Sequence, residues 1–235
     1  MSSCWRLSFA MLLLLFCAVA DAAPYPTESQ LRAAVGGIAP LLKAEGIALE
    51  SIDAATVGLT QPLLAAGMTP AGDTCKVFFN AKPENGLIEF FAAFENSEIP
   101  LLLDSLAVHE AMHCFEQREA FVRKHFDKVL PADFKPDTVT LQGYLSVVKS
   151  GALVKWGEAL ADIASILYLQ QAAPAQWNFY ASRLAAMRHG LAAKWPEHDT
   201  SPWLAKIIAA DVEASAGESL FETALRLRSR YRPVP

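Results

Sequence analysis

Two histidines four residues apart, with a glutamate directly after the first, are the part of this sequence best suited to metal chemistry. They are His109, Glu110 and His113, in the segment LLLDSLAVHEAMHCFEQREAF at 101–121. On an α-helix, residues i and i+4 lie on one face, so both imidazoles can reach a single ion. A zinc ion held there lowers the pKa of a bound water. Glu110 could then act as general base while that water attacks a carbonyl group.

The H-E-x-x-H pattern fixes only three positions, so its surroundings must distinguish a metal site from a surface helix that carries two histidines. The flanking stretches LLLDSLAV and MHCF are largely apolar, which predicts a buried helix. A buried helix loses stability when two imidazoles and a carboxylate have no partners. A metal ion would satisfy all three groups, so the apolar flanks favour the metal site.

A catalytic zinc site takes three protein ligands and leaves a further position open. One type of zinc protease extends the motif to H-E-x-x-H-x-x-G-x-x-H, in which the glycine lets the chain turn back. Here the glycine position is Glu116 and the last histidine position is Glu119. We therefore expect the helix to continue and to carry residue 119 away from the ion. Asp104 or another histidine is a third candidate, but neither has a comparable partner pattern.

A second pair of polar residues at helical spacing, Glu158 and Asp162, lies in the apolar segment VKWGEALADIASILYLQ. Two carboxylates on one face of such a helix are costly to bury unless a positive group meets them. Zinc and its histidines would be that group. Glu158 would then be the third ligand, and Asp162 would accept the N–H of a ligand histidine. The alternative is a solvated acidic face.

The segments HEAMH (109–113) and EALAD (158–162) together resemble the gluzincin group of zinc metallopeptidases, the thermolysin-like class. Its pattern is H-E-x-x-H on one helix and E-x-x-x-D on a later one, and the resemblance covers these two helices only. It implies that His109, His113 and Glu158 bind one Zn²⁺, that Glu110 is the general base, and that Asp162 supports His109. It also implies a zincin-like fold.

The resemblance further implies an edge strand beside the active helix that holds an extended peptide substrate. Residues 75–94 precede the helix and are placed for this role, and Asn80–Ala81 is similar to an N-A pair in that strand of thermolysin-like enzymes. An ordinary hairpin strand explains the same residues equally well.

Gluzincins also use a histidine or tyrosine from the C-terminal part to stabilise the tetrahedral oxyanion. His198, in the polar segment PEHDTSP, is the candidate here, with Asp199 available to orient it. Tyr144 and Tyr168 are rivals for the role, and a solvated loop histidine is the alternative. The two remaining histidines, at 125 and 189, lie among basic residues and are assigned no role.

The rest of the chain predicts an α+β protein that is mostly α-helical. Two or three short helices are expected over 28–67, and a β-hairpin over 75–96 with its turn at Asn85–Gly86. A long helix at about 101–119 follows, and the chain is expected to be helical from about residue 141 almost to its end. We predict one zincin-like domain over 23–235, with a small sheet beside the active helix and a helical C-terminal half.

The first 22 residues are typical of a secretory signal, with a basic start, a continuous apolar run and small residues after it. The apolar run is shorter than the roughly 20 residues that a membrane anchor needs, and no later segment is long and apolar enough to span a bilayer. Cleavage after Ala20 or Ala22 would leave an exported protein, periplasmic or secreted.

The formal net charge of −5 argues against nucleic acid as the main partner. The last part of the chain carries four arginines at alternate positions, which we expect to form a solvated helix end: Arg226, Arg228, Arg230 and Arg232.

Two of the four cysteines leave with the predicted signal, and Cys75 and Cys114 remain. An even pair in an exported protein predicts a disulfide. Cys114 directly follows His113, so this bond would attach the histidine helix to the segment that carries Cys75. Cys114 as a metal ligand is disfavoured because it points about 100° away from His113 around the helix.

Taken together, the motifs predict an exported zinc-dependent peptidase that acts on peptides or proteins. The alternative is a non-catalytic protein stabilised by zinc that binds a peptide or a component of the cell envelope. Glu110 distinguishes the two, because a pure binding protein has no need of a general base at that position.

Overall fold

A computed structural model describes residues 24–82, 85–131, 140–149, 151, 153–212 and 217–233. The predicted signal segment 1–22 lies outside the described residues. Within those ranges, no helix combines the length and the apolar character that crossing a membrane would require.

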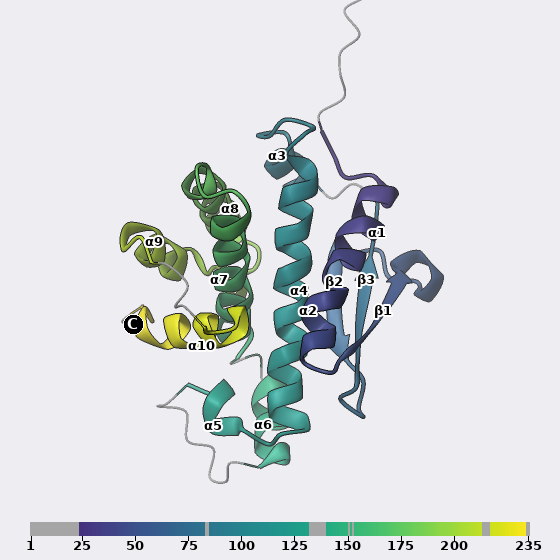
Figure 1. The fold of residues 1–235 in the computed structure, drawn as a ribbon, viewed down its shortest axis with the longest axis vertical. Helices are drawn as coiled ribbons and strands as arrows, with labels where there is room; N and C mark the ends of the chain where they lie inside the picture. The colour runs from purple at the N-terminus through teal and green to yellow at the C-terminus, as the bar shows by residue number, and fades with distance from the viewer. Residues whose placement is uncertain are drawn as a thin grey trace, which may run out of the picture.

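A long helix, α4 (Ile99–Phe121), lies between a small sheet and a group of helices (Figure 1). On the sheet side it is flanked by α1 (Glu28–Gly37) and α2 (Ala39–Ala44). The helices on its other side are α7 (Val154–Ala172), α8 (Trp177–Leu191), α9 (Ser201–Ala209) and α10 (Leu220–Arg230). The short elements are η1 (Ala54–Val57), α3 (Asn85–Phe91), α5 (Phe126–Val129), α6 (Leu141–Lys149) and η2 (Pro196–His198). The protein is therefore α+β and mostly helical.

The sheet has three strands in the order β1-β3-β2, formed by Ala48–Asp53, Thr74–Phe79 and Leu64–Met68 respectively. β1 runs parallel to β3, and β2 runs antiparallel to it. The prediction of helices over 28–67 is correct only as far as Ala44. Pairing with β3 recruits the later residues into strands, because ladder hydrogen bonds and side-chain packing outweigh the weak helical preference of an alanine- and leucine-rich segment.

The hairpin predicted over 75–96 is wrong. β3 ends at Phe79, and α3 begins at Asn85, where the hairpin turn was expected. The aromatic residues that suggested a second strand pack instead as a cluster, in which the ring of Phe90 contacts those of Phe91 and Phe94. A spacing of four residues, as between Phe90 and Phe94, brings side chains together on helical turns, so helical packing explains the same residues.

α4 extends beyond the predicted range at both ends and continues past residue 116, as expected from the lack of a glycine there. It is buried on several sides because the sheet and α7 both pack against it. Two contacts join it to α7: the Ser165 hydroxyl donates to the Ser105 carbonyl, and the Glu116 carboxylate lies against Gly157, where a Cβ would be 3.1 Å from Oε2. These small residues let the two helices approach closely.

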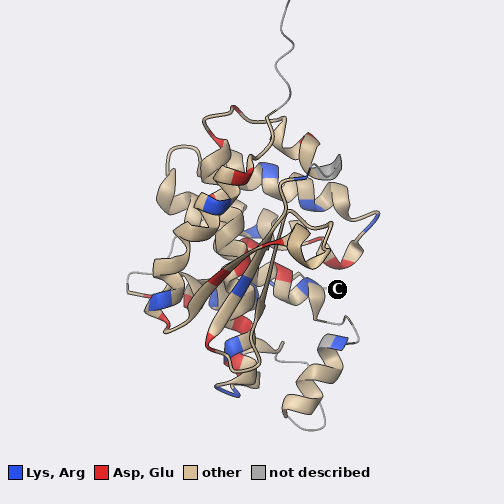
Figure 2. Cartoon of the chain, turned by 90° about the vertical axis from the view of Figure 1, so that its right-hand side faces the viewer, with Lys and Arg blue, Asp and Glu red and all other residues tan. Residues whose placement is uncertain are grey.

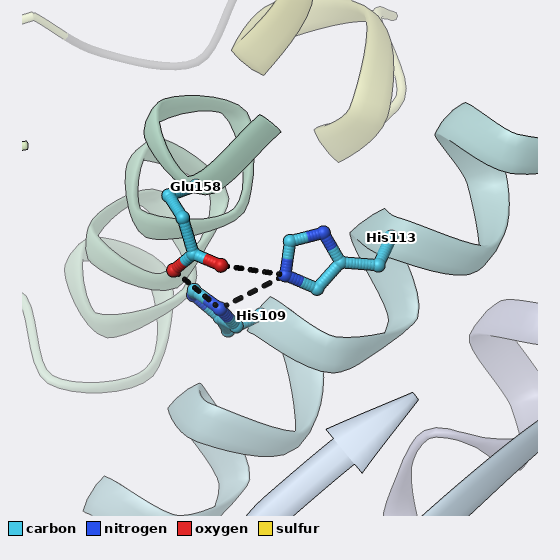
Figure 3. Close-up of side chains that lie close together, drawn as sticks. All are labelled: His109, His113 and Glu158. Atoms are coloured by element: carbon cyan, nitrogen blue, oxygen red, sulfur yellow. Dashed lines mark hydrogen bonds and ion pairs between the residues drawn. The ribbon is translucent and has the colours of Figure 1, made fainter. Parts of the chain in front are cut away.

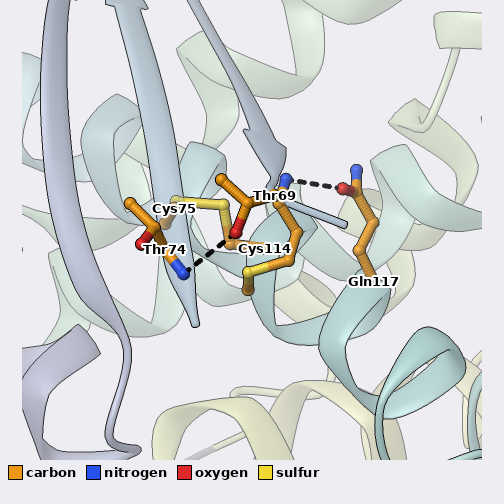
Figure 4. The surroundings of a disulfide bond; sticks show 6 residues. Thr69, Thr74, Cys75, Cys114 and Gln117 are labelled. Carbon is orange, nitrogen blue, oxygen red and sulfur yellow. Dashed lines mark hydrogen bonds between the residues drawn. A yellow bond between two sulfur atoms is a disulfide. The ribbon is translucent and has the colours of Figure 1, made fainter. Parts of the chain in front are cut away.

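A disulfide between Cys75 and Cys114 joins the central strand β3 to α4 (Figure 4). Both cysteines are fully buried. Nearby, Oε1 of Gln117 accepts a hydrogen bond from the Met68 N–H at 2.8 Å, which ties the end of β2 to the same helix. The sheet is therefore attached to the histidine helix at two neighbouring points.

Removal of this disulfide is expected to lower the free energy of unfolding by about 4 kcal/mol, because the bond closes a loop of about 40 residues and restricts the unfolded chain. The cysteines are 39 residues apart in sequence. Urea unfolding of the Cys75→Ala/Cys114→Ala variant measures the effect, and fully reduced wild-type protein controls for the lost sulfur packing. Equal stability of the oxidised and reduced wild type would contradict this expectation.

The prediction of a solvated strip of arginines near the C-terminus is wrong for Arg228, whereas Arg230 and Arg232 are exposed as expected. Arg228 is buried and donates to Oε1 of Glu116 at 2.7 Å and to the carbonyl oxygens of Trp156 and Val129. Its guanidinium also lies over the Trp156 ring. Arg226 instead pairs with Glu218. Over the face shown in Figure 2, basic and acidic residues are interspersed.

Candidate metal centre

Three side chains with metal-binding atoms meet between α4 and α7 (Figure 3). Nε2 of His109 lies 3.2 Å from Nε2 of His113. The carboxylate of Glu158 faces both rings, with one oxygen 3.5 Å from His109 Nε2 and the other 3.5 Å from His113 Nε2. Helical spacing brings the histidines together, and the contact between α4 and α7 brings the glutamate to them.

The spacing of these atoms fits a tetrahedral zinc ion. With metal–ligand distances of about 2.0–2.1 Å, a tetrahedral ion holds neighbouring ligand atoms roughly 3.3–3.4 Å apart. The two ring nitrogens are 3.2 Å apart, and each lies 3.5 Å from a different oxygen of Glu158, so these contacts are close to that spacing. Two imidazoles and one carboxylate are also a ligand set that zinc commonly takes in catalytic sites. The donors present therefore suit the ion that the sequence predicts.

Asp162 lies next to His109, one turn after Glu158 on α7, and is fully buried. Its Oδ1 is 2.9 Å from Nδ1 of His109, an ion-pair distance that is not aligned as a hydrogen bond. This places the second ring nitrogen of His109 against a carboxylate and leaves Nε2 directed at the other ligands, as expected for an outer partner of a metal-binding histidine.

Arg188 of α8 is part of this site and was missed in the sequence. Its Nη2 lies 2.9 Å from Oε2 of Glu158 and 2.7 Å from Oδ1 of Asp162. Arg188 therefore gives both carboxylates a positive partner in addition to the histidines. From the sequence, zinc and its histidines were expected to be that positive group. A signal was present: on α8 the buried positions are Trp177, Tyr180, Ala181, Leu184 and Arg188, so the arginine occupies an apolar stripe.

The charges around the three donors favour a bound cation. Burial opposes ionisation of Glu158, but the His198 hydrogen bond and the charges of His109 and Arg188 outweigh it and hold its pKa well below the usual range. For Asp162, burial is likewise outweighed by the charge of Arg188 and by contact with His109, so its pKa is also lowered. Two carboxylates thus share one guanidinium, which leaves a negative charge for a proton or a metal ion to balance.

The two histidines respond differently to this environment. Burial and repulsion from His109 lower the pKa of His113 to about 4, so its nitrogen lone pair is free at neutral pH. Burial would also lower the pKa of His109, but contact with Asp162 and the charges of Asp162 and Glu158 outweigh it and raise the pKa. His109 therefore holds a proton more readily than His113, and a metal ion would compete with that proton.

Glu110 lies next to the donors on α4 and is largely buried. Burial raises its pKa to about 7, against the opposing charge of His109. The backbone of Ala66, on β2, approaches the carboxylate and acts in the opposite direction, lowering this pKa. A carboxylate whose pKa is near neutrality suits a group that must both accept and release a proton.

His198 is also at the site. It ends the short helix η2, and its Nδ1 lies 3.4 Å from Oε2 of Glu158, with the side chain 35% exposed. Asp199 does not orient it as predicted, because its carboxylate accepts hydrogen bonds from the backbone and hydroxyl of Ser201. The carboxylate that His198 contacts most closely is therefore that of Glu158.

The two tyrosines considered as rivals to His198 lie elsewhere. Tyr144 packs in a separate apolar cluster against Phe121 and Phe126. The hydroxyl of Tyr168 is 3.5 Å from Oδ2 of Asp104. Tyr168 is ten residues beyond Glu158 on the same helix, which corresponds to roughly 15 Å along its axis. Among the three candidates for the oxyanion role, the structure brings His198 alone to the donors.

Glu119, the ligand position of the extended motif, points away from the donors as predicted. Its buried carboxylate contacts Arg123, His125 at 2.9 Å and Lys128 at 3.7 Å. These three basic groups satisfy it at the C-terminal end of α4. His125, which was assigned no role, thus has a structural partner.

The strand predicted to hold a substrate is not at an edge. β3 is the central strand of the sheet, so its hydrogen-bonding groups are taken by β1 and β2. Asn80, which follows it, is also engaged: its amide donates to the Thr60 carbonyl and accepts from the Lys82 N–H. The edge strand that packs against α4 is β2 instead.

The outer backbone groups of β2 belong to its even-numbered residues. Thr69 donates its N–H to Thr74, and Asn80 donates to the Leu63 carbonyl, so odd-numbered residues form the ladder with β3. The outward N–H groups of Ala66 and Met68 then contact α4, through Glu110 and Gln117 as described above.

A scan against protein-family models found no match, and neither a curated protein nor a solved structure matched the chain.

Proposed function

We propose that this protein is an exported zinc-dependent metallopeptidase of the gluzincin type. One observation carries the proposal: the Nε2 atoms of His109 and His113 and the carboxylate of Glu158 converge at the spacing of a tetrahedral zinc site, directly beside Glu110. The zincin-like arrangement of an edge strand, a motif helix and a second ligand helix is part of the same proposal. It is supported by β2, α4 and α7.

In this function His109, His113 and Glu158 hold the zinc ion, and Asp162 keeps the ring of His109 in position. When bound, zinc polarises a carbonyl group and makes water acidic enough to lose a proton near neutral pH. Glu110 would take that proton, because its carboxylate is close enough to His109 and Glu158 to feel their charges and its pKa of about 7 lets it accept and then release a proton.

Two further groups have roles in substrate binding under this proposal. His198 is partly exposed at the donors, so its imidazole can donate to an oxygen that becomes negative during the reaction. The outer edge of β2, next to Glu110, is the surface against which an extended peptide can lie. The substrate class is therefore a peptide or an unfolded segment of a protein.

One observation favours the non-catalytic alternative, a zinc-stabilised binding protein. The outward N–H of Met68 is already bonded to Gln117 of α4, and the outward N–H of Ala66 lies near Glu110, so part of the β2 edge is occupied. A substrate would have to displace these side chains or bind to the remaining groups of the strand.

The Glu110→Gln variant separates the two functions. Glutamine has the same shape but cannot take a proton, so we expect hydrolysis of a peptide library to fall at least about 100-fold. Zinc content should stay at the wild-type value, because Glu110 is not among the three donors. Mass spectrometry of the digested library and metal analysis of the purified mature protein give the two readouts.

The matched control is Glu50→Gln, a partly exposed glutamate on β1 that pairs with Lys76. It should change neither readout. Zinc-loaded wild type that cleaves nothing supports the binding protein, and a Glu110→Gln variant with undiminished hydrolysis would show that another group is the base.

A further inference from the structure

Thr200 occupies the position before α9 where a threonine normally caps a helix, yet its side chain makes no capping hydrogen bond. A capping hydroxyl would accept from an N–H in the first turn of the helix. Here Asp199 accepts the Ser201 N–H, and the Thr200 hydroxyl donates to Oδ2 of Asp162. Thr200 is fully buried. Its hydroxyl is directed into the protein and therefore does not cap α9.

The two oxygens of Asp162 have different partners. Oδ1 faces His109 Nδ1 at 2.9 Å and Arg188 Nη2 at 2.7 Å, whereas Oδ2 accepts from Thr200. A buried carboxylate bonded on one oxygen only could rotate about its last torsion, which is broad. The Thr200 hydroxyl opposes that rotation and so keeps Oδ1 directed at the histidine.

Thr200 also fixes the segment that carries His198. Its backbone N–H donates to the His198 carbonyl at 3.0 Å, and its own carbonyl accepts from Trp203 at the start of α9. The imidazole of His198 lies 3.4 Å from Oε2 of Glu158. The contact between the Thr200 hydroxyl and Asp162 of α7 therefore helps to place His198 beside Glu158.

We infer that Thr200 is a positioning residue of the metal site. Its hydroxyl bond to Asp162 fixes the His109 ring and the turn that carries His198 in position relative to α7. The inference deepens the proposed function and rests on it for the part that concerns zinc. Its structural part, the placement of the two histidines, holds with or without the metal.

The metal-free test compares Thr200→Val, which removes the hydroxyl and keeps the shape, with Thr200→Ser, which keeps the hydroxyl. The chain has five histidines, and their ring nitrogens can be observed by long-range ¹H–¹⁵N NMR at one pH. Thr200→Val is expected to shift the signals of His109 and His198 and to leave His125 and His189 unchanged. Thr200→Ser is expected to restore the wild-type spectrum.

Thr223→Val is the matched control. Thr223 is equally buried, and its hydroxyl donates to Glu218, which lies just before α10 and away from the donors. It should lower stability without moving the signals of His109 or His198. If Thr200→Val does not fold, Thr200→Ala, which removes the same hydroxyl with less bulk beside the carboxylate, replaces it.

The second readout is zinc affinity, measured by competition with a chromophoric chelator on the same variants of the mature chain. Thr200→Val should bind zinc about 10- to 100-fold more weakly than wild type, the usual effect of losing an outer partner of a ligand. Thr200→Ser and Thr223→Val should match wild type. A Thr200→Val variant with the wild-type spectrum and affinity overturns the inference and leaves the proposed function intact. Wild type that binds no zinc overturns the proposed function, while the histidine spectra still decide the positioning role.

Discussion

Glu158→Gln is expected to abolish stoichiometric zinc binding. Glutamine keeps the size of the proposed ligand but removes its negative charge. It also leaves Arg188 beside a neutral amide, close to the position that the ion would occupy. The loss should exceed the roughly 10- to 100-fold that removal of an outer partner costs. Metal analysis of the purified protein and a chelator competition give the zinc content and the affinity.

Glu119→Gln is the control for this prediction. Glu119 is also a buried glutamate, on α4 itself, but its partners are Arg123, His125 and Lys128. This variant is expected to keep wild-type zinc affinity even if it is less stable. Zinc retained by Glu158→Gln and lost by Glu119→Gln would assign the third ligand to the extended motif instead.

Arg228→Met is expected to lower the free energy of unfolding by about 3–5 kcal/mol, because removal of one partner leaves the other as an uncompensated buried charge. The stranded group is Glu116, whose Oε1 accepts from Arg228 at 2.7 Å. The carbonyl oxygens of Trp156 and Val129 lose a donor as well. Urea unfolding monitored by tryptophan fluorescence measures the change.

Two comparisons make this prediction specific. Arg226→Met removes a partly exposed pair with Glu218, which is worth only about 0–1 kcal/mol. The double variant Glu116→Leu/Arg228→Met removes both buried charges and should recover a large part of the lost stability. If Arg226→Met lowers the free energy of unfolding as much as Arg228→Met does, burial of the charge is not the cause of the lost stability.

The metal donors were predictable because their signals are local. A spacing of four residues on a helix places side chains together whatever the helix packs against, and both HEAMH and EALAD use this spacing. The structure brings Glu158 to the two histidines, as expected from two carboxylates at helical spacing on an apolar helix, and its ligand role stays a prediction. The place of Asp162 beside His109 followed from the same helical geometry.

The groups that complete the site could not be placed in this way. Arg188 and Thr200 reach Asp162 from elements 26 and 38 residues further along the chain, and sequence spacing does not encode such tertiary contacts. Thr200 gave no signal, since a threonine before Ser201–Pro202 suggests an ordinary helix cap.

The sheet was misjudged for a related reason. β1 and β2 are short and partly exposed, and they become strands through pairing with β3, which lies after both in the sequence. Strand preference depends on such neighbours more than helix preference does. The aromatic residues after β3 were assigned to a strand because alternation and helical packing are hard to separate in short apolar stretches.

The close contact between α4 and α7 has a consequence for which ions the site can accept. Ser105 with Ser165 on one side, and Glu116 with Gly157 on the other, bracket the donors along both helices and keep the helices at a set separation. Calcium prefers six to eight oxygen ligands at roughly 2.3–2.6 Å, and magnesium demands an octahedral shell. Under the proposed function, a site of two nitrogens and one carboxylate held between these helices would therefore disfavour both abundant cations and favour transition-metal ions of zinc's size.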